Sequence, residues 1–320
     1  MLSYHMGWTD QHGSPEDNPS HIHLPAILAL TTCEQISGDF RHALPVAAAL
    51  ELMHNFTSVH GDVQNGGSES QTRPSIWWVW GPSQAINAGD GLHALARSAI
   101  MRLSETTLNT DVTLQAIKSL DEACLSFCEG QYMDLTFQDQ LLVTEGDYFS
   151  MVGKKSGALP ACGGTLGAMC AGADQTFISQ IKNFGQNLGT ASKLIQDTNE
   201  LWGPNGNGMT SSNLIEKKKS LPLIYAFENS SIAVKRELGN IYMKRVLEPE
   251  DSSRVIEILN DSGAKDYSEA RAKNLISECL ASLQTLDIPG DELTGFESLL
   301  EIATTQTLFN VDDTVLDQSD

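Results

Sequence analysis

The 320-residue chain has few basic residues: 20 lysines and arginines stand against 41 aspartates and glutamates, which gives a formal charge of −21. Nucleic acids and anionic membrane surfaces are bound through basic patches, so this balance argues against both as partners. A strongly acidic surface repels other copies of the chain and keeps it in solution. We therefore expect a solvated, self-repelling surface and no nucleic-acid partner.

Long apolar runs and zinc-type cysteine spacings are also missing. No stretch reaches the roughly 18 apolar residues of a membrane span. The N-terminus has no basic region followed by an apolar run, as a signal peptide would. The six cysteines include no CxxC pair, and Cys124 and Cys128 lie one helical turn apart, which is more typical of a helix core than of redox chemistry. These absences predict a cytoplasmic protein with reduced thiols.

Apolar residues recur at helical spacing along most of the chain, whereas strand-like alternation is nearly absent. We expect an all-α fold, organised as a single domain over residues 1–320 with a polar, loop-like N-terminal segment at 1–20 and an acidic tail at 305–320. Residues 66–74 are predicted to form a polar loop. Helices are predicted at 24–35, from about 41 to 65, and at 85–103, 114–129, 148–156, 159–171, 175–201, 221–228, 232–247, 253–259, 268–286 and 294–304.

Two of the predicted helices carry a polar stripe. The stripes consist of His54, Ser58, Gly61, Asp62 and Asn65 in residues 51–65, and of Gly189, Lys193, Gln196, Asp197 and Glu200 in residues 189–200. Both use the same five offsets, which line one face of a helix at about 3.6 residues per turn. Two such stripes facing each other across a bundle would suit Mg²⁺, a hard cation that takes oxygen ligands and bridges to phosphates.

The stripes belong to six sequence blocks that together resemble the trans-type isoprenyl (polyprenyl) diphosphate synthases. The blocks are ALELMHNFTSVHGD, RPSIWWVWGPSQAINAGDGLHALA, CEGQYMDLTF, MVGKKSGALPACGGTLGA, FGQNLGTASKLIQDTNELWG and KKKSLPLIYA. The resemblance covers most of the chain and implies a helical bundle of the isoprenoid synthase type around a central cavity. It also implies a reaction in which Mg²⁺ ions, held between two aspartate-rich motifs, help to ionise an allylic diphosphate. The resulting carbocation then alkylates isopentenyl diphosphate.

The two motifs usually read DDxxD in this family, but here they read GDVQN at 61–65 and QDTNE at 196–200. The metal ligands that the resemblance implies are Asp62, Asn65, Asp197 and Glu200. Only three of these are carboxylates. Several Mg²⁺ ions in one cavity need that negative charge, because unscreened like charges at short range repel by several kcal/mol even at an effective dielectric constant of about 20. We expect Mg²⁺ as the cofactor, with fewer than three ions.

Cationic positions that hold diphosphate in the family are reduced as well. The family's GKxxRP block corresponds to SHIHLP at 20–25, so that its lysine and arginine become His21 and Leu24. Two arginines that follow the first motif become Ser70 and Gln71, while Arg73 matches a further arginine. Each lost guanidinium contact removes charge-assisted hydrogen bonds of roughly 1.5–3 kcal/mol. We expect condensation with isopentenyl diphosphate to be weak or lost.

Other positions match the family and supply the remaining candidate site. The resemblance implies substrate binding by His54, which would contact isopentenyl diphosphate, and by Lys155 and Lys218, which would contact the allylic diphosphate. It implies a catalytic set of Lys155 with Gln131 and Asp134, the last two forming a polar pair near the reacting carbons.

Phe56 lies five positions before the first motif, where a bulky aromatic closes the product tunnel in this family. Helical angle alone places it nearly opposite the first polar stripe. Each candidate also has an ordinary alternative. His54 could be a hydrogen-bonded core histidine, the lysines at 217–219 a solvated helix start, and Phe56 a core phenylalanine.

Three functions are compatible with these residues. The first is a divergent enzyme that ionises a short allylic prenyl diphosphate for prenyl transfer or terpene cyclisation, with a reduced Mg²⁺ site. The second is a catalytically silent subunit that pairs with an active relative. Members of this family are commonly dimers, so we expect a homodimer or a heterodimer with an active relative. The third is a carrier for a neutral isoprenoid. We rank them in this order. The remaining Asp62, Asp197, Glu200, Lys155 and Lys218 favour the enzyme, whereas the joint loss of acidic and basic residues favours the silent subunit. Fold analogy does not decide between them, because function depends on the site.

Overall fold

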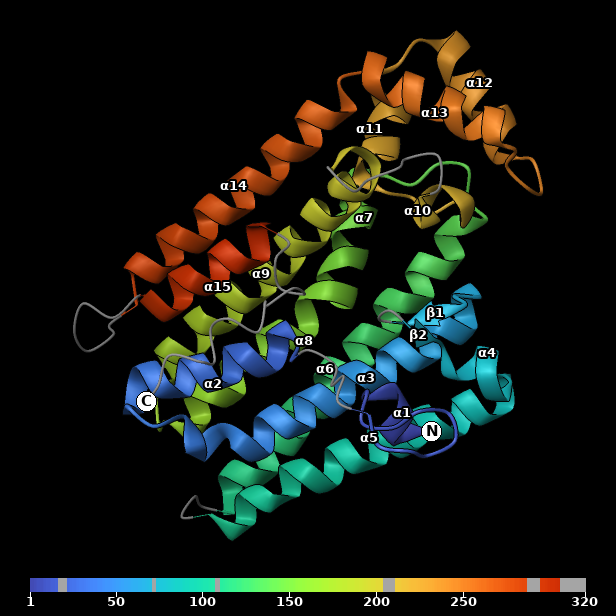
Figure 1. Cartoon of the computed structure of the whole chain (residues 1–320). Coiled ribbons are helices and arrows are strands. Elements are labelled where there is room, and N and C mark those ends of the chain that lie inside the picture. Colours follow the sequence, from blue (N-terminus) through green and yellow to red (C-terminus); the bar gives the residue numbers. More distant parts are fainter. Residues whose placement is uncertain (17–21, 71–72, 107–109, 204–210, 287–293, 306–320) are drawn as a thin grey trace, which may run out of the picture. The chain divides into compact units, whose positions relative to one another are not determined.

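A computed structural model describes residues 1–16, 22–70, 73–106, 110–203, 211–286 and 294–305 (Figure 1). The elements in chain order are α1 (Leu2–His5), α2 (Leu24–Ser37), η1 (Phe40–Ala43), α3 (Leu44–Asn65), β1 (Glu69–Ser70), β2 (Arg73–Pro74), α4 (Ile76–Trp80), α5 (Pro82–Met101), η2 (Arg102–Glu105), α6 (Thr110–Gln138), α7 (Glu145–Val152), η3 (Gly153–Gly157), α8 (Ala158–Cys170), α9 (Gln175–Trp202), α10 (Ser212–Ile215), α11 (Leu221–Asn229), α12 (Ile232–Tyr242), α13 (Pro249–Asp261), α14 (Ala264–Gln284) and α15 (Thr294–Thr305). The prediction of an all-α fold is confirmed.

The chain divides into two compact units, each with its own apolar core. Unit 1 is drawn from Met1–Cys124, Leu159–Lys182 and Asp287–Phe296, and unit 2 from Leu125–Ala158, Asn183–Leu286 and Glu297–Asp320. The first polar stripe lies in unit 1 and the second in unit 2. That the two stripes face one cavity stays a prediction.

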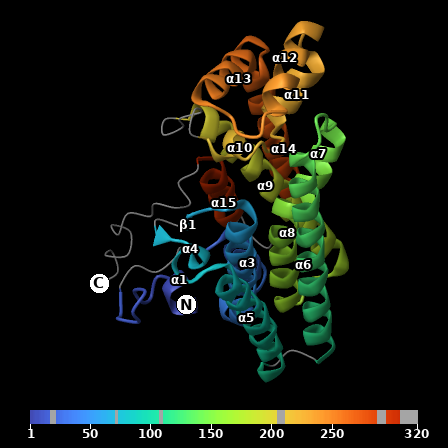
Figure 2. The same ribbon diagram turned by 90° about the vertical axis from the view of Figure 1, so that its right-hand side faces the viewer.

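Unit 1 is built around α3, which packs side by side with α5 (Figures 1 and 2). The close contact depends on Gly89 of α5, because a Cβ at that position would overlap with the ring of His60 on α3. Leu50 and Met53 of α3 are fully buried, in one core with Ile100 of α5. This core fixes the direction in which the polar stripe of α3 points.

The N-terminal residues differ from the polar loop predicted for them. Leu2–His5 is a short helix in which Tyr4 and His5 are buried. Arg73 holds this helix in place by donating to the carbonyl of Tyr4 at 2.8 Å and by stacking on the Tyr4 ring. The prediction of a loop was wrong here because tertiary contacts, rather than local periodicity, order so short a helix.

Residues 66–74 also contain more structure than the predicted loop. Glu69–Ser70 and Arg73–Pro74 pair as a two-residue antiparallel hairpin. Gly66, which ends α3, adopts a left-handed conformation with φ of 71°, a region that glycine enters without steric cost.

Unit 2 contains the C-terminal helices, and α11, α12 and α13 form one group in both views (Figures 1 and 2). One of its cores brings together Leu223 and Phe227 of α11, Leu238 of α12, and Val255 of α13. A second core surrounds Tyr148 of α7. Tyr148, Met151 and Val152 of this core also line the polar pocket described below.

Most predicted helices are found, with differences at their ends. The helix predicted from about 41 begins as a separate 3₁₀ turn, because the Asp39 side chain accepts a hydrogen bond from the Arg41 amide. The helix predicted at 114–129 extends over Thr110–Gln138, and the one predicted at 232–247 ends at Tyr242. No helix among the described residues is long and apolar enough to cross a membrane.

Candidate functional site

Lys155 is positioned by a π-helical turn, η3, between α7 and α8. Such turns are rare and often occur at functional sites. Gly130 of α6 lets this turn approach closely, since a Cβ there would lie 2.5 Å from the amide nitrogen of Lys155. The Gln186 side chain of α9 donates to the Gly153 carbonyl at 2.6 Å. The backbone around Lys155 is therefore fixed from two sides.

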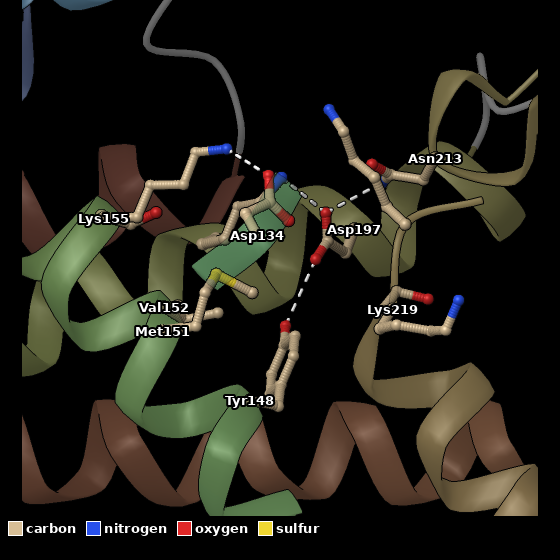
Figure 3. A pocket seen from close by; sticks show the side chains of 12 residues that line it. Asp134, Tyr148, Met151, Val152, Lys155, Asp197, Asn213 and Lys219 are labelled. Atoms are coloured by element: carbon tan, nitrogen blue, oxygen red, sulfur yellow. Dashed lines mark hydrogen bonds and ion pairs between the residues drawn. The ribbon is translucent and has the colours of Figure 1, made fainter. Parts of the chain in front are cut away.

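A polar pocket lies within unit 2, between η3, α6, α9 and the start of α11 (Figure 3). It is lined by Asp134, Tyr148, Met151, Val152, Lys155, Ser156, Lys193, Asp197, Asn213, Lys218, Lys219 and Ser220. Four of these residues are lysines and two are aspartates. The lining alone thus carries an excess of positive charge, in a protein whose overall charge is −21.

Lys155 and Asp134 form an ion pair at the pocket, with 2.6 Å between Nζ and Oδ2. Their side chains are only 19% and 6% exposed, so solvent screens the pair little. Burial lowers the pKa of Lys155, and the neighbouring Asp134 carboxylate opposes this effect. Two residues predicted from the family blocks are therefore direct partners. Gln131, the third predicted catalytic residue, is buried on α6 one turn before Asp134.

Asp197 receives three protein donors from three elements. Lys193, one turn earlier on α9, places its ammonium 2.7 Å from Oδ1. The Asn213 amide donates to Oδ1 at 3.0 Å, and the Tyr148 hydroxyl donates to Oδ2 at 3.3 Å (Figure 3). Burial lowers the pKa of Lys193, but the adjacent Asp197 carboxylate outweighs it, so that the pKa is raised.

Glu200 shares a donor with Asp197. The Asn213 side-chain amide donates to Glu200 Oε2 at 2.7 Å, and the Asn213 backbone amide donates to Oε1 at 3.1 Å. The Ser211 hydroxyl adds a third hydrogen bond to Oε1, at 2.8 Å. Asn213 therefore bridges the two carboxylates of the second motif.

Lys218 and Lys219 do not form a solvated helix start. Lys218 lines the pocket and pairs with Glu216 at 2.8 Å, while Lys219 is 4% exposed. The ammonium of Lys219 donates to the carbonyls of Lys217 and Gln138 and lies 5.0 Å from the centre of the Tyr242 ring. Burial and the neighbouring Lys217 lower the pKa of Lys219 to about 8.

The predicted residues of the first motif lie on α3 in unit 1. Asp62 and Asn65 are half-buried near the end of this helix, and Asn65 Oδ1 is a buried oxygen that no described group hydrogen-bonds. His54 stacks on His23 with 3.8 Å between ring centres, and burial together with the charge of His23 lowers the pKa of His54 to about 3. Phe56 packs edge-to-face on His60 and His93.

A carboxylate stands beside the block in which the family carries cations. Glu51 of α3 accepts from His23 Nδ1 at 2.7 Å and from the His23 backbone amide at 3.0 Å. The Asn55 side-chain amide donates to Glu51 at 2.9 Å, and its Oδ1 accepts from His5 Nε2 at 2.9 Å. Burial would raise the pKa of Glu51, but the hydrogen bonds and charge of His23 lower it.

The other cationic positions of the family are not replaced among the described residues. Leu24 begins α2 and has no polar side chain, while Arg73 directs its guanidinium at the Tyr4 and Thr9 carbonyls and at Glu16. His21, Gln71 and the side chain of Ser70 lie outside the part of the chain that the structure describes.

The polyprenyl synthetase family model matches residues 23–259. The chain belongs to the polyprenyl synthetase family. Geranylgeranyl diphosphate synthase of Mycobacterium tuberculosis is 34% identical over 286 residues, covering 88% of this chain and 80% of that protein. Geranylgeranyl diphosphate synthase of Methanosarcina mazei is 30% identical, covering 87% of this chain and 82% of that protein.

Solved structures agree with this assignment. The polyprenyl synthetase from Streptomyces coelicolor A3(2) superimposes with a TM-score of 0.84 at 28% identity, covering 94% of this chain and 90% of that one. Geranylgeranyl pyrophosphate synthetase from Pyrococcus horikoshii gives 0.80 at 26% identity, covering 88% and 84%. The fold is that of the isoprenoid synthases, and the protein is a member of a family of Mg²⁺-dependent prenyltransferases of isoprenoid biosynthesis.

The family's metal fits the two motifs unequally. Among the described residues, no group of three or more His, Cys, Asp or Glu side chains is placed to hold an ion. At the first motif, the buried Asn65 Oδ1 and the Asp62 carboxylate are oxygen donors of the kind that Mg²⁺ takes. At the second motif, the carboxylates of Asp197 and Glu200 already accept from Lys193 and Asn213. The second motif, as it is arranged here, does not fit a Mg²⁺ ion.

Eight of the twelve lining residues were absent from the predicted site, among them Lys193, Lys219, Tyr148 and Asn213. Lys193 carried a usable signal, because it stands in the polar stripe one turn before Asp197. Lys219 adjoins the predicted Lys218, but sequence position does not show burial. Tyr148 and Asn213 reach Asp197 from 49 and 16 residues away, and such contacts follow from the fold alone.

Proposed function

We propose that this polyprenyl synthetase family member binds a short allylic prenyl diphosphate through the unit 2 pocket and ionises it, for prenyl transfer or terpene cyclisation. The observation that carries the proposal is the gathering of Lys155, Lys193, Lys218 and Lys219 in one pocket lining. Lys155, Lys193 and Lys218 pair with carboxylates, whereas the described hydrogen bonds of Lys219 go to carbonyl groups. A buried ammonium without a carboxylate partner is costly unless an anion binds to it. The relatives' named products, geranylgeranyl and farnesyl diphosphates, indicate the class of anion.

The chemistry asked of these residues is stabilisation of the leaving group. Ionisation breaks the bond between the allylic carbon and the diphosphate oxygen, and the electron pair leaves with the diphosphate. Preplaced ammonium groups favour that charge development in a site shielded from water. Lys155 and Lys218 are proposed to bind the diphosphate, and Gln131 and Asp134 to act near the reacting carbons, with Asp134 orienting Lys155 through the 2.6 Å ion pair.

Residues of unit 1 carry further proposed roles. Asp62 and Asn65 would hold Mg²⁺, with fewer than three ions in all, and an ion bound there would act as a Lewis acid. His54 and Phe56 are assigned to substrate binding. Condensation with isopentenyl diphosphate is expected to be weak, because Glu51 brings a carboxylate to His23 in the block where the family has cations.

One observation favours a second candidate, a catalytically silent subunit in a dimer with an active relative. Both carboxylates of the second motif are engaged by protein donors, Lys193 and Asn213. A chain that cannot assemble the family's metal cluster could still dimerise and influence a partner.

Product analysis separates the two candidates. The purified protein is incubated with geranyl or farnesyl diphosphate and Mg²⁺, with and without isopentenyl diphosphate, and organic-soluble products are identified by mass spectrometry. The enzyme proposal expects release of diphosphate and a terpene or prenyl product without isopentenyl diphosphate, and loss of both in Lys155→Gln. If the wild-type protein binds the allylic diphosphate but forms no product, the result supports the silent subunit.

A further inference from the structure

The second motif is already neutralised by a cation of the protein itself. Lys193 lies one turn before Asp197 on α9, and its ammonium is 2.7 Å from Asp197 Oδ1. The side chain of Asp197 is 4% exposed, so the pair is shielded from solvent. The Asn213 amide then joins Asp197 to Glu200, at 3.0 and 2.7 Å. The carboxylates of Asp197 and Glu200, which would attract a dication, are thus already bound to protein donors.

Lys193 is also one of the residues that line the pocket. An ammonium has three N–H donors, and the ion pair with Asp197 uses one of them. The remaining donors can reach a phosphate oxygen, in company with the three other lysines of the lining. Lys193 therefore combines two properties of a metal bound at an aspartate-rich motif, since it neutralises the carboxylate and presents positive charge to the anion.

We propose that Lys193 is a diphosphate-binding residue that takes the place of a divalent cation at the second motif, so that the unit 2 pocket binds diphosphate without a metal at Asp197 and Glu200. This inference rests on the proposed function, because it names how the same pocket neutralises its anion. It predicts a binding step that survives removal of Mg²⁺.

The test is calorimetric titration of the full-length protein with inorganic pyrophosphate, in EDTA and in Mg²⁺ buffer. Wild-type affinity should differ by less than about threefold between the two buffers. Lys193→Gln should bind about tenfold or more weakly in EDTA, because it loses a charge-assisted contact. Lys193→Arg should retain most of the metal-free binding.

Lys154→Gln is the matched control. Lys154 belongs to the same π-helical turn as Lys155, but it pairs with Glu129 at 2.7 Å and is not part of the pocket lining. Its substitution should leave pyrophosphate binding at the wild-type level. Circular dichroism and thermal unfolding of every variant show whether the fold is intact.

The outcomes separate this inference from the proposed function. Wild-type binding in Mg²⁺ that falls more than about tenfold in EDTA, with Lys193→Gln unchanged, overturns the role of Lys193 and leaves the pocket as the diphosphate site. Absence of binding in both buffers overturns the proposed function together with the inference.

A second measurement does not involve an anion. Mn²⁺ binding is followed by electron paramagnetic resonance in the wild-type protein and in Glu200→Gln. Equal Mn²⁺ affinities are expected if no metal binds at the second motif. Weaker Mn²⁺ binding by Glu200→Gln than by the wild type would contradict the proposal.

Discussion

The ammonium of Lys155 lies 2.6 Å from Asp134 Oδ2, and both side chains are largely withdrawn from solvent. Gly130 admits the π-helical turn that carries Lys155, so the pair is held by backbone packing as well as by charge. Removing one member of a buried ion pair leaves the other without compensation, which is far costlier than losing a surface pair.

Asp134→Asn should therefore destabilise the protein by about 2–4 kcal/mol. It should not weaken pyrophosphate binding, since it removes a negative charge from the pocket. Urea unfolding and calorimetry check the two expectations. The control is Glu129→Gln, which breaks the more exposed pair with Lys154 and should cost less than about 1 kcal/mol. Equal destabilisation by both variants would show that the Lys155–Asp134 pair has no special place in the fold.

Acidification should destabilise the protein through the histidines of unit 1. Burial lowers the pKa of His5 to about 4, with the charges of His23 and Arg73 adding to the effect while Asn55 and Glu51 oppose it. The unfolded chain has a histidine pKa near 6.5, so it binds the proton first as pH falls.

The stability that neutral His5 contributes is complete above pH 6.5 and is lost as pH falls from there to about 4. The free energy of unfolding should fall by up to about 1.4 kcal/mol per pH unit for each such group, and His54, with its pKa near 3, adds to the slope. Urea unfolding between pH 7.5 and 5 measures it. His5→Gln keeps a hydrogen-bonding partner for Asn55 and should flatten the slope; an unchanged slope would contradict the assignment.

The first motif should gain metal affinity from one added carboxylate. Gly61 replaces the first aspartate of the family motif, and a Cβ at this position would meet no other atom within 4 Å. Gly61→Asp should therefore fold normally and bind Mn²⁺ about tenfold more tightly, because ligand charge tunes affinity. Gln64→Glu, at an exposed position outside the polar stripe, adds the same charge and serves as the control. An equal gain in both variants would indicate unspecific attraction.

Helical periodicity and the six family blocks predicted the fold because both are local properties of the sequence. They also selected Lys155, Asp134 and Asp197, which the structure brings to one pocket. They could not show that Asp197 is engaged by Lys193 and Asn213, since a motif defines ligands by residue type and not by their partners. The family pattern predicts a carboxylate that binds a metal ion, whereas here the ammonium of Lys193, one turn away, forms an ion pair with Asp197.

The N-terminal segment shows the same limit. Its polar composition predicted a loop, yet Tyr4 is buried and its carbonyl accepts from Arg73, a residue 69 positions away. Arg73 matches a family arginine by position, but its hydrogen bonds serve packing. Position within a family-like sequence block therefore identified Arg73 as a match, but it did not predict what the side chain contacts.

Phe56 offers a test of chain-length selection. The ring packs on His60 and His93, at 4.8 and 5.3 Å between ring centres. If Phe56 sets prenyl chain length, as the family resemblance implies, Phe56→Ala should extend binding from geranyl to longer prenyl diphosphates, at a cost in stability of about 3–5 kcal/mol. Phe56→Leu should have a chain-length preference between those of the wild type and Phe56→Ala. Calorimetry with prenyl diphosphates of graded length decides it, and an unchanged preference in Phe56→Ala would identify an ordinary core phenylalanine.

The most direct test of the account is the affinity of the full-length protein for geranyl diphosphate in Lys155→Gln and Lys218→Gln. Both residues line the unit 2 pocket, whereas the nearby Lys154 does not. Isothermal titration in Mg²⁺ buffer should show about tenfold weaker binding in each pocket variant, and wild-type binding in Lys154→Gln. Wild-type affinity in both pocket variants, with the fold intact, would contradict the assignment of this pocket as the diphosphate site.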